Sequence, residues 1–478
     1  MTYYLSRAGM VMGLVGYVVW LAVAQGVWSF ADPDVFYHMG MATHLLEFGL
    51  ADQFSGLAPT TLGQHFVDQH FLMHALLGVF IWLMTPVVGT KVFVIVLLLL
   101  CLATFMWMLR TMQLKGWWVA VGLVAVTNPW LFRLNLIKAT PLALTLLWLS
   151  IIALVKKRYW WLAMIGAVYV WTHGGFILLP LVVAAWCLTH KTIVPLLYTV
   201  GGIALALLLH PAFSDNLFFY WEQLVQIGVV NYQNSIGVGG EWYPYNPGNL
   251  LFGHGLLVAA LTTVVVITVG LRRRLSATQL FFILITVGMT VLTLKSRRYV
   301  EYLAPFLAAA VVGAIRELPL HLHHNIKTLL QYLLPACVVV MAAVPVLLSS
   351  LSGVQRDLHD GQPTNYLSGA SQYLATQPTG IVAPSDWDDF PALWYGAPYQ
   401  QYLIGLDATF LYRANAYRYE AWKNITLGEA ADPIQAVETI AADYYVVAKD
   451  HTAMYQQLIT AGGQTVYQDD EAWVVTIL

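Results

Sequence analysis

Two aspartates, a tyrosine and a histidine follow the first apolar segment of the chain in quick succession. The stretch reads Ala-Asp-Pro-Asp-Val-Phe-Tyr-His and contains Asp32, Asp34, Tyr37 and His38. On a helix Asp34 and His38 share a face, because residues four apart are neighbours there. Asp32 would lie at the helix start, where an aspartate accepts hydrogen bonds from backbone N–H groups. Capping explains one of these acids, so we predict catalytic roles for Asp32, Asp34 and His38.

Four more residues with possible metal-binding side chains follow in the same predicted loop: His65, Asp68, His70 and His74. His70 and His74 are spaced to bridge a metal on a helix, although packing at a membrane interface is the more common use of such a pair. Asp68 is better placed to meet the first two aspartates. If Asp32, Asp34, His65 and Asp68 converge, they would form a site for a divalent cation such as Mg²⁺ or Mn²⁺.

Two clusters of basic residues lie beside apolar segments on the side of the membrane where basic residues are uncommon. One consists of Arg133 and Lys138, and the other of Lys295, Arg297 and Arg298. Guanidinium and ammonium groups in such positions bind phosphate through charge-assisted hydrogen bonds. Contact with lipid headgroups is an equally good explanation.

A long loop over residues 210–248 contains acidic and aromatic residues. Glu222 and Glu241 are its candidate acids, and Trp242 and Tyr243 follow the second of them. Aromatic faces stack on sugars, so these four residues suit a loop that covers a sugar or lipid substrate. The same aromatic residues would also suit the belt that such side chains form at a membrane surface.

The elements that position these residues are predicted to be membrane helices. The chain is 59% hydrophobic and 10% charged, whereas soluble proteins carry about 25% charged residues. Its net charge of -2 gives no reason to expect a nucleic-acid partner. About eleven apolar segments approach the roughly 20 residues that cross a bilayer. They cover residues 8–29, 89–109, 116–129, 139–155, 159–172, 174–189, 192–209, 249–271, 278–294, 300–315 and 328–350.

Basic residues indicate the orientation of these segments. With the N-terminus inside, the runs Lys156-Lys157-Arg158 and Arg272-Arg273-Arg274 both face the cytoplasm, as the positive-inside rule requires. This holds only if residues 70–86 form an interfacial or re-entrant helix within a first outer loop over 30–88. The alternative is that 70–86 spans the membrane and another weak span is missed.

The sequence divides into a membrane domain over residues 1–352 and an extracytoplasmic α/β domain over residues 353–478. Beyond residue 352 the apolar runs shorten and polar residues appear throughout. We predict strands at 380–383, 444–448 and 471–478. Helices are predicted at 433–442 and 450–461 in the same domain, and a further amphipathic helix at 35–48 in the first outer loop.

Asp32-Pro33 followed by Tyr37-His38 resembles the Asp-Pro...Tyr-Arg pattern of oligosaccharyltransferase catalytic subunits, which belong to the GT-C superfamily of membrane glycosyltransferases. Asn128-Pro129-Trp130...Arg133 is similar to the second outer loop of that superfamily. The chain departs from the pattern at His38, which replaces the arginine, and at 131–138, where the usual acid is missing. In that family the aspartate helps to hold a divalent metal or acts as the acid/base group.

The resemblance implies a glycosyltransferase in the plasma (inner) membrane. It would move a sugar from a polyprenyl-phosphate-linked donor to a glycan or protein acceptor on the extracytoplasmic face, among membrane lipids. Arg133, Lys138, Lys295, Arg297 and Arg298 would contact the donor phosphate. One alternative is a surface-polysaccharide polymerase or ligase. The other is a non-catalytic transporter or assembly scaffold, although inverted repeats typical of transporters are not visible.

Overall fold

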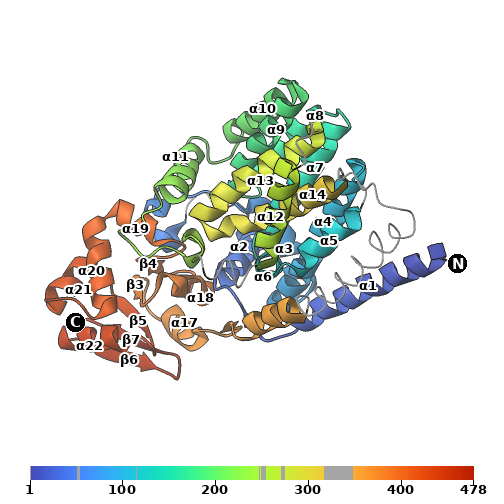
Figure 1. The fold of residues 1–478 in the computed structure, drawn as a ribbon. Helices are drawn as coiled ribbons and strands as arrows, with labels where there is room; N and C mark the ends of the chain where they lie inside the picture. Colours follow the sequence, from blue (N-terminus) through green and yellow to red (C-terminus); the bar gives the residue numbers. More distant parts are fainter. Residues whose placement is uncertain are drawn as a thin grey trace. The chain divides into compact units, whose positions relative to one another are not determined.

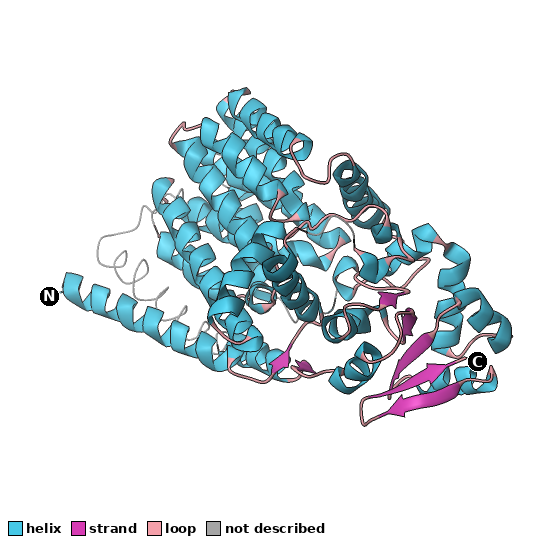
Figure 2. Cartoon of the chain, turned by 180° about the vertical axis from the view of Figure 1, so that it is seen from behind, coloured by secondary structure: helices cyan, strands magenta, loops and turns pink. Residues whose placement is uncertain are grey.

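The computed structural model describes residues 2–50, 54–114, 116–246, 248, 255–270, 275–316 and 348–477. This part of the chain is mostly helical, with a small sheet towards the C-terminus (Figures 1 and 2). By its internal contacts the chain forms two compact units, each built from three segments. Unit 1 comprises Met1–Ala31, Lys91–Leu205 and Glu241–Gly361, and unit 2 comprises Asp32–Thr90, Ala206–Gly240 and Gln362–Leu478. The predicted boundary between residues 352 and 353 divides the chain once, whereas each of these units combines separate segments. That boundary stays a prediction.

Unit 1 is a body of apolar helices. They are α1 (Thr2–Gln25), α4 (Pro86–Thr111), α5 (Trp117–Val126), α6 (Asn128–Asn135), α7 (Thr140–Val155), α8 (Trp160–Val170), α9 (Leu178–His190), α10 (Val194–Leu208), α12 (Gly255–Gly270), α13 (Ala277–Lys295) and α14 (Val300–Arg316). Their starts follow local rules. The Ser276 side chain accepts a hydrogen bond from the Gln279 N–H at the start of α13, and a proline occupies the first turn of both α6 and α7.

Helix α14 is the centre of unit 1, where it packs against α5, α6, α12 and α13. Small residues such as Ala304, Ala308 and Gly313 allow these helices to approach closely. A Cβ atom at Gly313 would clash with the side chain of Gln279 on α13. The four neighbours therefore fix α14, and with it the acidic residue of its first turn, Glu301.

Few of the described helices are long enough to cross a membrane alone. Among the described ranges, α4 with 26 residues and α13 with 19 meet the length and hydropathy that a span requires. Helices α6 and α7 meet at 113° and would make a third span if counted together. The predicted count of about eleven is not confirmed, because α8, α9 and α10 are shorter than the roughly 20 residues of a full span. Most of 328–350, and all of Arg272-Arg273-Arg274, lie outside the described residues.

The first outer loop contributes its helices to unit 2. They are α2 (Asp34–Phe48), η1 (Ser55–Leu57), η2 (Thr61–Gly63) and α3 (Phe71–Leu83). The helix predicted at 35–48 is confirmed, and it packs against α3. Helix α3 has 13 residues and is therefore about 20 Å long, well short of a hydrocarbon core of about 30 Å. The interfacial or re-entrant placement of 70–86 stays a prediction.

The C-terminal part of unit 2 is an α/β domain with a mixed five-stranded sheet in the order β4–β3–β5–β7–β6 (Figure 2). The strands are β3 (Ile381–Pro384), β4 (Gln401–Tyr402), β5 (Tyr444–Ala448), β6 (Gln464–Gln468) and β7 (Ala472–Thr476). Strand β3 is parallel to β4 and β5, and β7 is antiparallel to β5 and β6. The three predicted strands correspond to β3, β5 and β7. The two predicted helices correspond to α21 (Pro433–Ile440) and α22 (Thr452–Thr460), which lie beside the sheet in Figure 1.

Further helices complete unit 2. They are α11 (Asp215–Trp221), the π-helix η4 (Glu222–Val230), α17 (Ser368–Ala375), α18 (Phe390–Gly396), α19 (Ala408–Ala414) and α20 (Ala416–Leu427). Aspartates begin some of the helical segments after the strands: Asp386 accepts from the Asp388 N–H at 3.2 Å, and Asp407 from the Thr409 N–H at 2.8 Å. In this domain the acids at the strand ends therefore act as helix caps.

Candidate functional site

A chain of hydrogen-bonded side chains joins Asp68, His74 and His38 in unit 2. The Asp68 carboxylate lies 2.8 Å from His74 Nδ1, and His74 Nε2 lies 2.8 Å from His38 Nδ1. His38 and His74 are 4% and 0% exposed, so water does not compete for these bonds. The ring of His70 lies 5.4 Å from that of His38, edge to face. Three histidines and one acid predicted from the sequence therefore lie together.

Asp68 also lies in the turn before helix α3. Its second oxygen accepts a hydrogen bond from the N–H of His70 at 3.0 Å, and His70 is the residue that precedes the helix. Burial raises the pKa of Asp68, but His74 and His70 lower it by more, so that the net shift is downward. Asp68 is therefore a carboxylate that accepts from both the His70 backbone and the His74 ring.

Asp32 and Asp34 have different positions at the start of helix α2. Asp32 accepts a hydrogen bond from the Asp34 N–H at 2.9 Å. The residue that precedes α2 is Pro33, so Asp32 lies one position before the cap. Asp34 is the first residue of α2, and the helix carries it on the same face as His38. Burial raises the pKa of Tyr37, and the negative charges of Asp68 and Asp34 raise it further. The predicted meeting of Asp68 with Asp32 and Asp34 stays a prediction.

The four candidate metal ligands do not gather around one point. His65 lies 3.0 Å from Asp215, and its ring lies 4.4 Å from that of Phe218 at a tilt of 43°, while Asp68 is bound to His74. Within the described ranges, no three His, Cys, Asp or Glu side chains are arranged to hold a metal ion. A divalent cation stays a prediction.

Glu222, a candidate acid of the outer loop, is enclosed by internal partners of unit 2. It is 1% exposed, accepts from Thr61 Oγ1 at 2.9 Å and from Arg413 Nε at 2.8 Å. Arg413 also donates to Gln226 at 3.0 Å, one turn further along the π-helix. A buried carboxylate without such partners would cost several kcal/mol. Glu222 therefore fastens the π-helix to α19 of the C-terminal domain.

Glu241, the other candidate acid, lies among three cations of unit 1. Its carboxylate is 2.7 Å from Arg133, 3.4 Å from Arg298 and 3.7 Å from Lys138. Arg133 also donates from Nε to Glu301 on α14. Burial raises the pKa of Glu241, but Arg298, Lys138 and Arg133 lower it by much more, so the group is ionised. Members of both predicted basic clusters thus lie at one carboxylate. We call the group of Arg133, Lys138, Arg298, Glu241 and Glu301 the cation cluster.

Backbone contacts hold the loop at Glu241 in place. Ser296 Oγ donates to the Glu241 carbonyl at 2.8 Å, and the Arg297 N–H donates to the Tyr243 carbonyl at 3.0 Å. The guanidinium of Arg298 lies 4.3 Å from the centre of the Trp242 ring. Lys295 and Arg297 are exposed at the same turn between α13 and α14. The predicted loop residues and phosphate-binding residues are therefore neighbours in unit 1.

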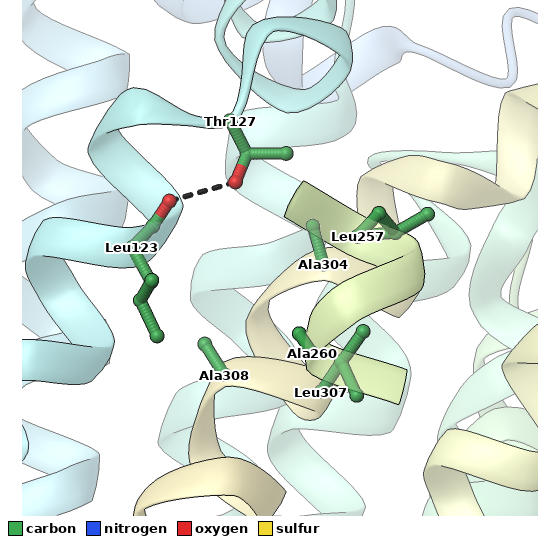
Figure 3. A pocket seen from close by; sticks show the side chains of 7 residues that line it. All are labelled: Leu123, Thr127, Leu257, Ala260, Ala304, Leu307 and Ala308. Atoms are coloured by element: carbon green, nitrogen blue, oxygen red, sulfur yellow. Dashed lines mark hydrogen bonds between the residues drawn. The ribbon is translucent and has the colours of Figure 1, made fainter. Parts of the chain in front are cut away.

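A small apolar pocket lies between helices α5, α12 and α14 of the same unit (Figure 3). Its walls are Leu123, Thr127, Leu257, Ala260, Ala304, Leu307 and Ala308. Ala304 and Ala308 follow Glu301 by three and seven residues, so they lie on the same face of α14 as that acid. The pocket thus begins one helical turn from the cation cluster.

Sequence reasoning did not find two residues that the structure places at these centres. Arg413 lies in a helix of the C-terminal domain, and no motif indicates its contact with Glu222. Glu301 follows the basic cluster in the sequence, and nothing there indicates its contact with Arg133. In both cases the available signal was the need of a buried charge for an opposite one.

The fold has counterparts among solved membrane glycosyltransferases. The oligosaccharyltransferase AglB from Archaeoglobus fulgidus, in complex with an inhibitory peptide and a dolichol-phosphate, matches with TM-score 0.63 at 11% identity, over 99% of this chain and 74% of that chain. ArnT from Cupriavidus metallidurans, bound to undecaprenyl phosphate, matches with TM-score 0.57 at 14% identity, over 98% of both chains. The arabinofuranosyltransferase AftD from mycobacteria matches with TM-score 0.56 at 13% identity, over 98% of this chain and 40% of that chain.

All three proteins are GT-C superfamily glycosyltransferases, so the predicted resemblance to this superfamily is confirmed at the level of the fold. By sequence, no protein-family model and no curated protein matches the chain.

The Glu222–Arg413 pair is expected to stabilise unit 2. In a double-mutant cycle of Glu222→Gln and Arg413→Gln, we expect a coupling energy of about 1–3 kcal/mol, because each single change leaves a buried polar group without its partner. The cycle is measured by unfolding of the purified protein in detergent.

The matched control is the exposed pair of Glu420 and Lys423, 3.4 Å apart in the same unit. Its coupling should stay below about 0.5 kcal/mol. If the effects of the Glu222 and Arg413 changes simply add, the fastening role is wrong.

Proposed function

We propose that this protein transfers a sugar from a polyprenyl-phosphate-linked donor to a glycan or protein acceptor on the extracytoplasmic face of the plasma (inner) membrane. One observation supports this most directly: the cation cluster and the apolar pocket lie one turn apart on the same face of α14. A polyprenyl phosphate combines the same two chemistries, an anionic head and an apolar chain. AglB and ArnT, which share the fold, are each solved with a polyprenyl phosphate.

The cation cluster would bind the donor phosphate. Arg133, Lys138 and Arg298 already hold one anionic group, the Glu241 carboxylate, at 2.7–3.7 Å. Planar guanidinium groups bind phosphate oxygens in the same way as carboxylate oxygens. A phosphate that enters the cluster therefore takes the place of Glu241, and Lys295 and Arg297 add positive charge at the same turn.

We assign proton transfer to Asp34 and His38, which share one face of α2. Glycosyl transfer requires a group that removes the proton of the acceptor while the acceptor attacks the sugar. A carboxylate and an imidazole four residues apart can hold the acceptor and accept its proton. Asp32 keeps the helix start that positions both groups.

The loop residues divide into two roles. Glu222 is occupied by Arg413 and Thr61 in unit 2, so we assign it to holding the loop. Trp242 and Tyr243 adjoin the cation cluster in unit 1. We assign these two aromatic residues to the sugar next to the donor phosphate, because aromatic faces stack on sugars.

Replacing Asp34 by asparagine is expected to lower transfer about 10²-fold or more, because the variant loses the carboxylate that, together with His38, holds the acceptor while its proton is removed. The assay uses the protein in nanodiscs with undecaprenyl-phosphate glucose, galactose, mannose or N-acetylglucosamine, each labelled in the sugar. It measures loss of label from the lipid fraction, in the presence of an envelope extract as acceptor.

Asp32→Asn is the companion variant, because its amide oxygen can still accept the hydrogen bond from the Asp34 N–H. A lower rate of transfer in this variant would therefore report the loss of the charge of Asp32 and not the loss of that hydrogen bond. Wild-type rates in both variants would refute the catalytic assignment of this segment.

Replacing Arg298 by glutamine is expected to raise the donor KM by about 10-fold or more, because a hydrogen bond to a charged group is worth about 1.5–3 kcal/mol. The kcat should change less, since phosphate binding precedes transfer. The exposed Arg356 of unit 1 serves as the control in Arg356→Gln. An unchanged KM in Arg298→Gln would exclude this residue from the phosphate site.

The orientation of the protein in the membrane is tested by cysteine labelling in intact cells. Cys101, Cys187 and Cys337 are first replaced by alanine. Tyr417 is 86% exposed in the C-terminal domain, and Tyr417→Cys should react with a membrane-impermeant maleimide. Arg158 is also exposed, but Arg158→Cys should react only after the cells are permeabilised. The reverse pattern would place the C-terminal domain in the cytoplasm.

A further inference from the structure

His74 is buried and makes two side-chain hydrogen bonds, yet the proposed transfer assigns it no role. It connects the carboxylate of Asp68 to the ring of His38 through two contacts of 2.8 Å. The three groups come from three places: Asp68 from the segment before α3, His74 from α3, and His38 from α2. Packing alone would be satisfied by an apolar residue at position 74, so two polar bonds at a fully buried ring call for a chemical explanation.

The order of donors and acceptors along these hydrogen bonds determines which nitrogen of each ring carries the proton. A carboxylate only accepts hydrogen bonds, so the Nδ1 of His74 must carry the proton that Asp68 accepts. The Nε2 of neutral His74 then carries the lone pair and accepts from Nδ1–H of His38. In neutral His38 the remaining lone pair is therefore on Nε2, the ring nitrogen that can take up a proton.

We propose that His74 and Asp68 are positioning residues that hold His38 in the tautomer and orientation in which its Nε2 accepts the proton of the acceptor. This inference rests on the proposed transfer, which it makes more specific. His74 and Asp68 act through His38 and do not contact the substrates themselves.

The step balances without an oxidant, a reductant or a metal. The acceptor X–H, in which X is oxygen or nitrogen, gives its proton to His38 Nε2. The electron pair of X forms the bond to the anomeric carbon of the sugar. The bond between that carbon and the phosphate oxygen breaks, and its electron pair stays on the lipid phosphate. The imidazolium of His38 is stabilised through His74 by the charge of Asp68 and later passes its proton to the phosphate or to water.

Other titratable groups lie near His38 and must be considered in any pH profile. The rings of His70 and His74 on α3 lie 5.4 and 5.1 Å from that of His38, and Tyr37 on α2 lies 5.5 Å from it. Asp68 before α3 is hydrogen-bonded to His74, Asp34 precedes His38 by four residues on α2, and Tyr395 on α18 contacts Phe36 of the same helix. Of these, Asp68 carries the negative charge that is hydrogen-bonded into the chain. Removing this charge should make His38 harder to protonate.

The arrangement of protons is tested first, because this test does not require activity. ¹⁵N-histidine-labelled protein in nanodiscs is examined by NMR at pH 8, and the signals of His38 and His74 are assigned from His38→Gln and His74→Gln. We expect both rings in the Nδ1–H form in the wild type. In Asp68→Asn we expect a mixture of tautomers, because an amide can donate to or accept from His74 while its oxygen still accepts from the His70 N–H.

The catalytic consequence is tested with the donor that the wild type uses, by loss of label from the lipid fraction across a pH series. Asp68→Asn and His74→Gln should each lower kcat about 10-fold or more and leave the donor KM within about twofold. The acid limb of the kcat profile should move to lower pH in Asp68→Asn. The control is His44→Gln on the same helix α2, where the His44 ring packs on Phe48 at 5.1 Å.

The outcomes are separable. If His38 carries its proton on Nε2 in the wild type, the chain is oriented differently and the inference is overturned, whatever the activity. The inference is also overturned if the wild type is active and the kcat and pH profile of Asp68→Asn match it. If the expected tautomers are found but the wild type releases label from none of the four donors, the hydrogen-bonded chain is supported and the proposed transfer fails.

Discussion

A buried charge is stable only beside an opposite one, and this constraint governs how the loops of this protein are placed. Only 10% of the residues are charged, and an unpaired buried ion costs several kcal/mol. In unit 1, Glu241 is held by cations that come from the segments around α6 and α13. In unit 2, Glu222 is held by Arg413, which is remote in sequence. Each pairing fixes the position of its loop.

The two units use charge in different ways. The cation cluster of unit 1 contains three positive groups and two carboxylates, and Lys295 and Arg297 at the same turn increase the positive excess, which suits the binding of an anion. The polar centre of unit 2 consists of carboxylates and imidazoles, which suit the movement of protons. Asp32 and Asp68 also accept hydrogen bonds from the backbone in the turns before α2 and α3.

The sequence predicted best those features that arise from local patterns. Runs of apolar residues predict the buried strands β3, β5 and β7 and the helix at 35–48. The position of Asp32 before Pro33 predicts its hydrogen bond to the backbone near the start of α2. Strand β6 was not predicted because most of its side chains are exposed, so it lacks the apolar signal. The meeting of Arg133 with Glu241 and the contact of Arg413 with Glu222 depend on residues more than a hundred positions apart. Local spacing contains no information on such pairs.

Glu241 occupies the same cations that would receive a lipid phosphate, which makes it an intramolecular competitor. Being tethered, it is present at a high effective concentration whatever the amount of lipid around it. A donor phosphodiester carries one negative charge, whereas the lipid phosphate left after transfer carries up to two. Three cations alone would retain this product more strongly than the donor. The returning carboxylate would oppose that retention, so turnover would depend on how readily a segment of the protein replaces its own product.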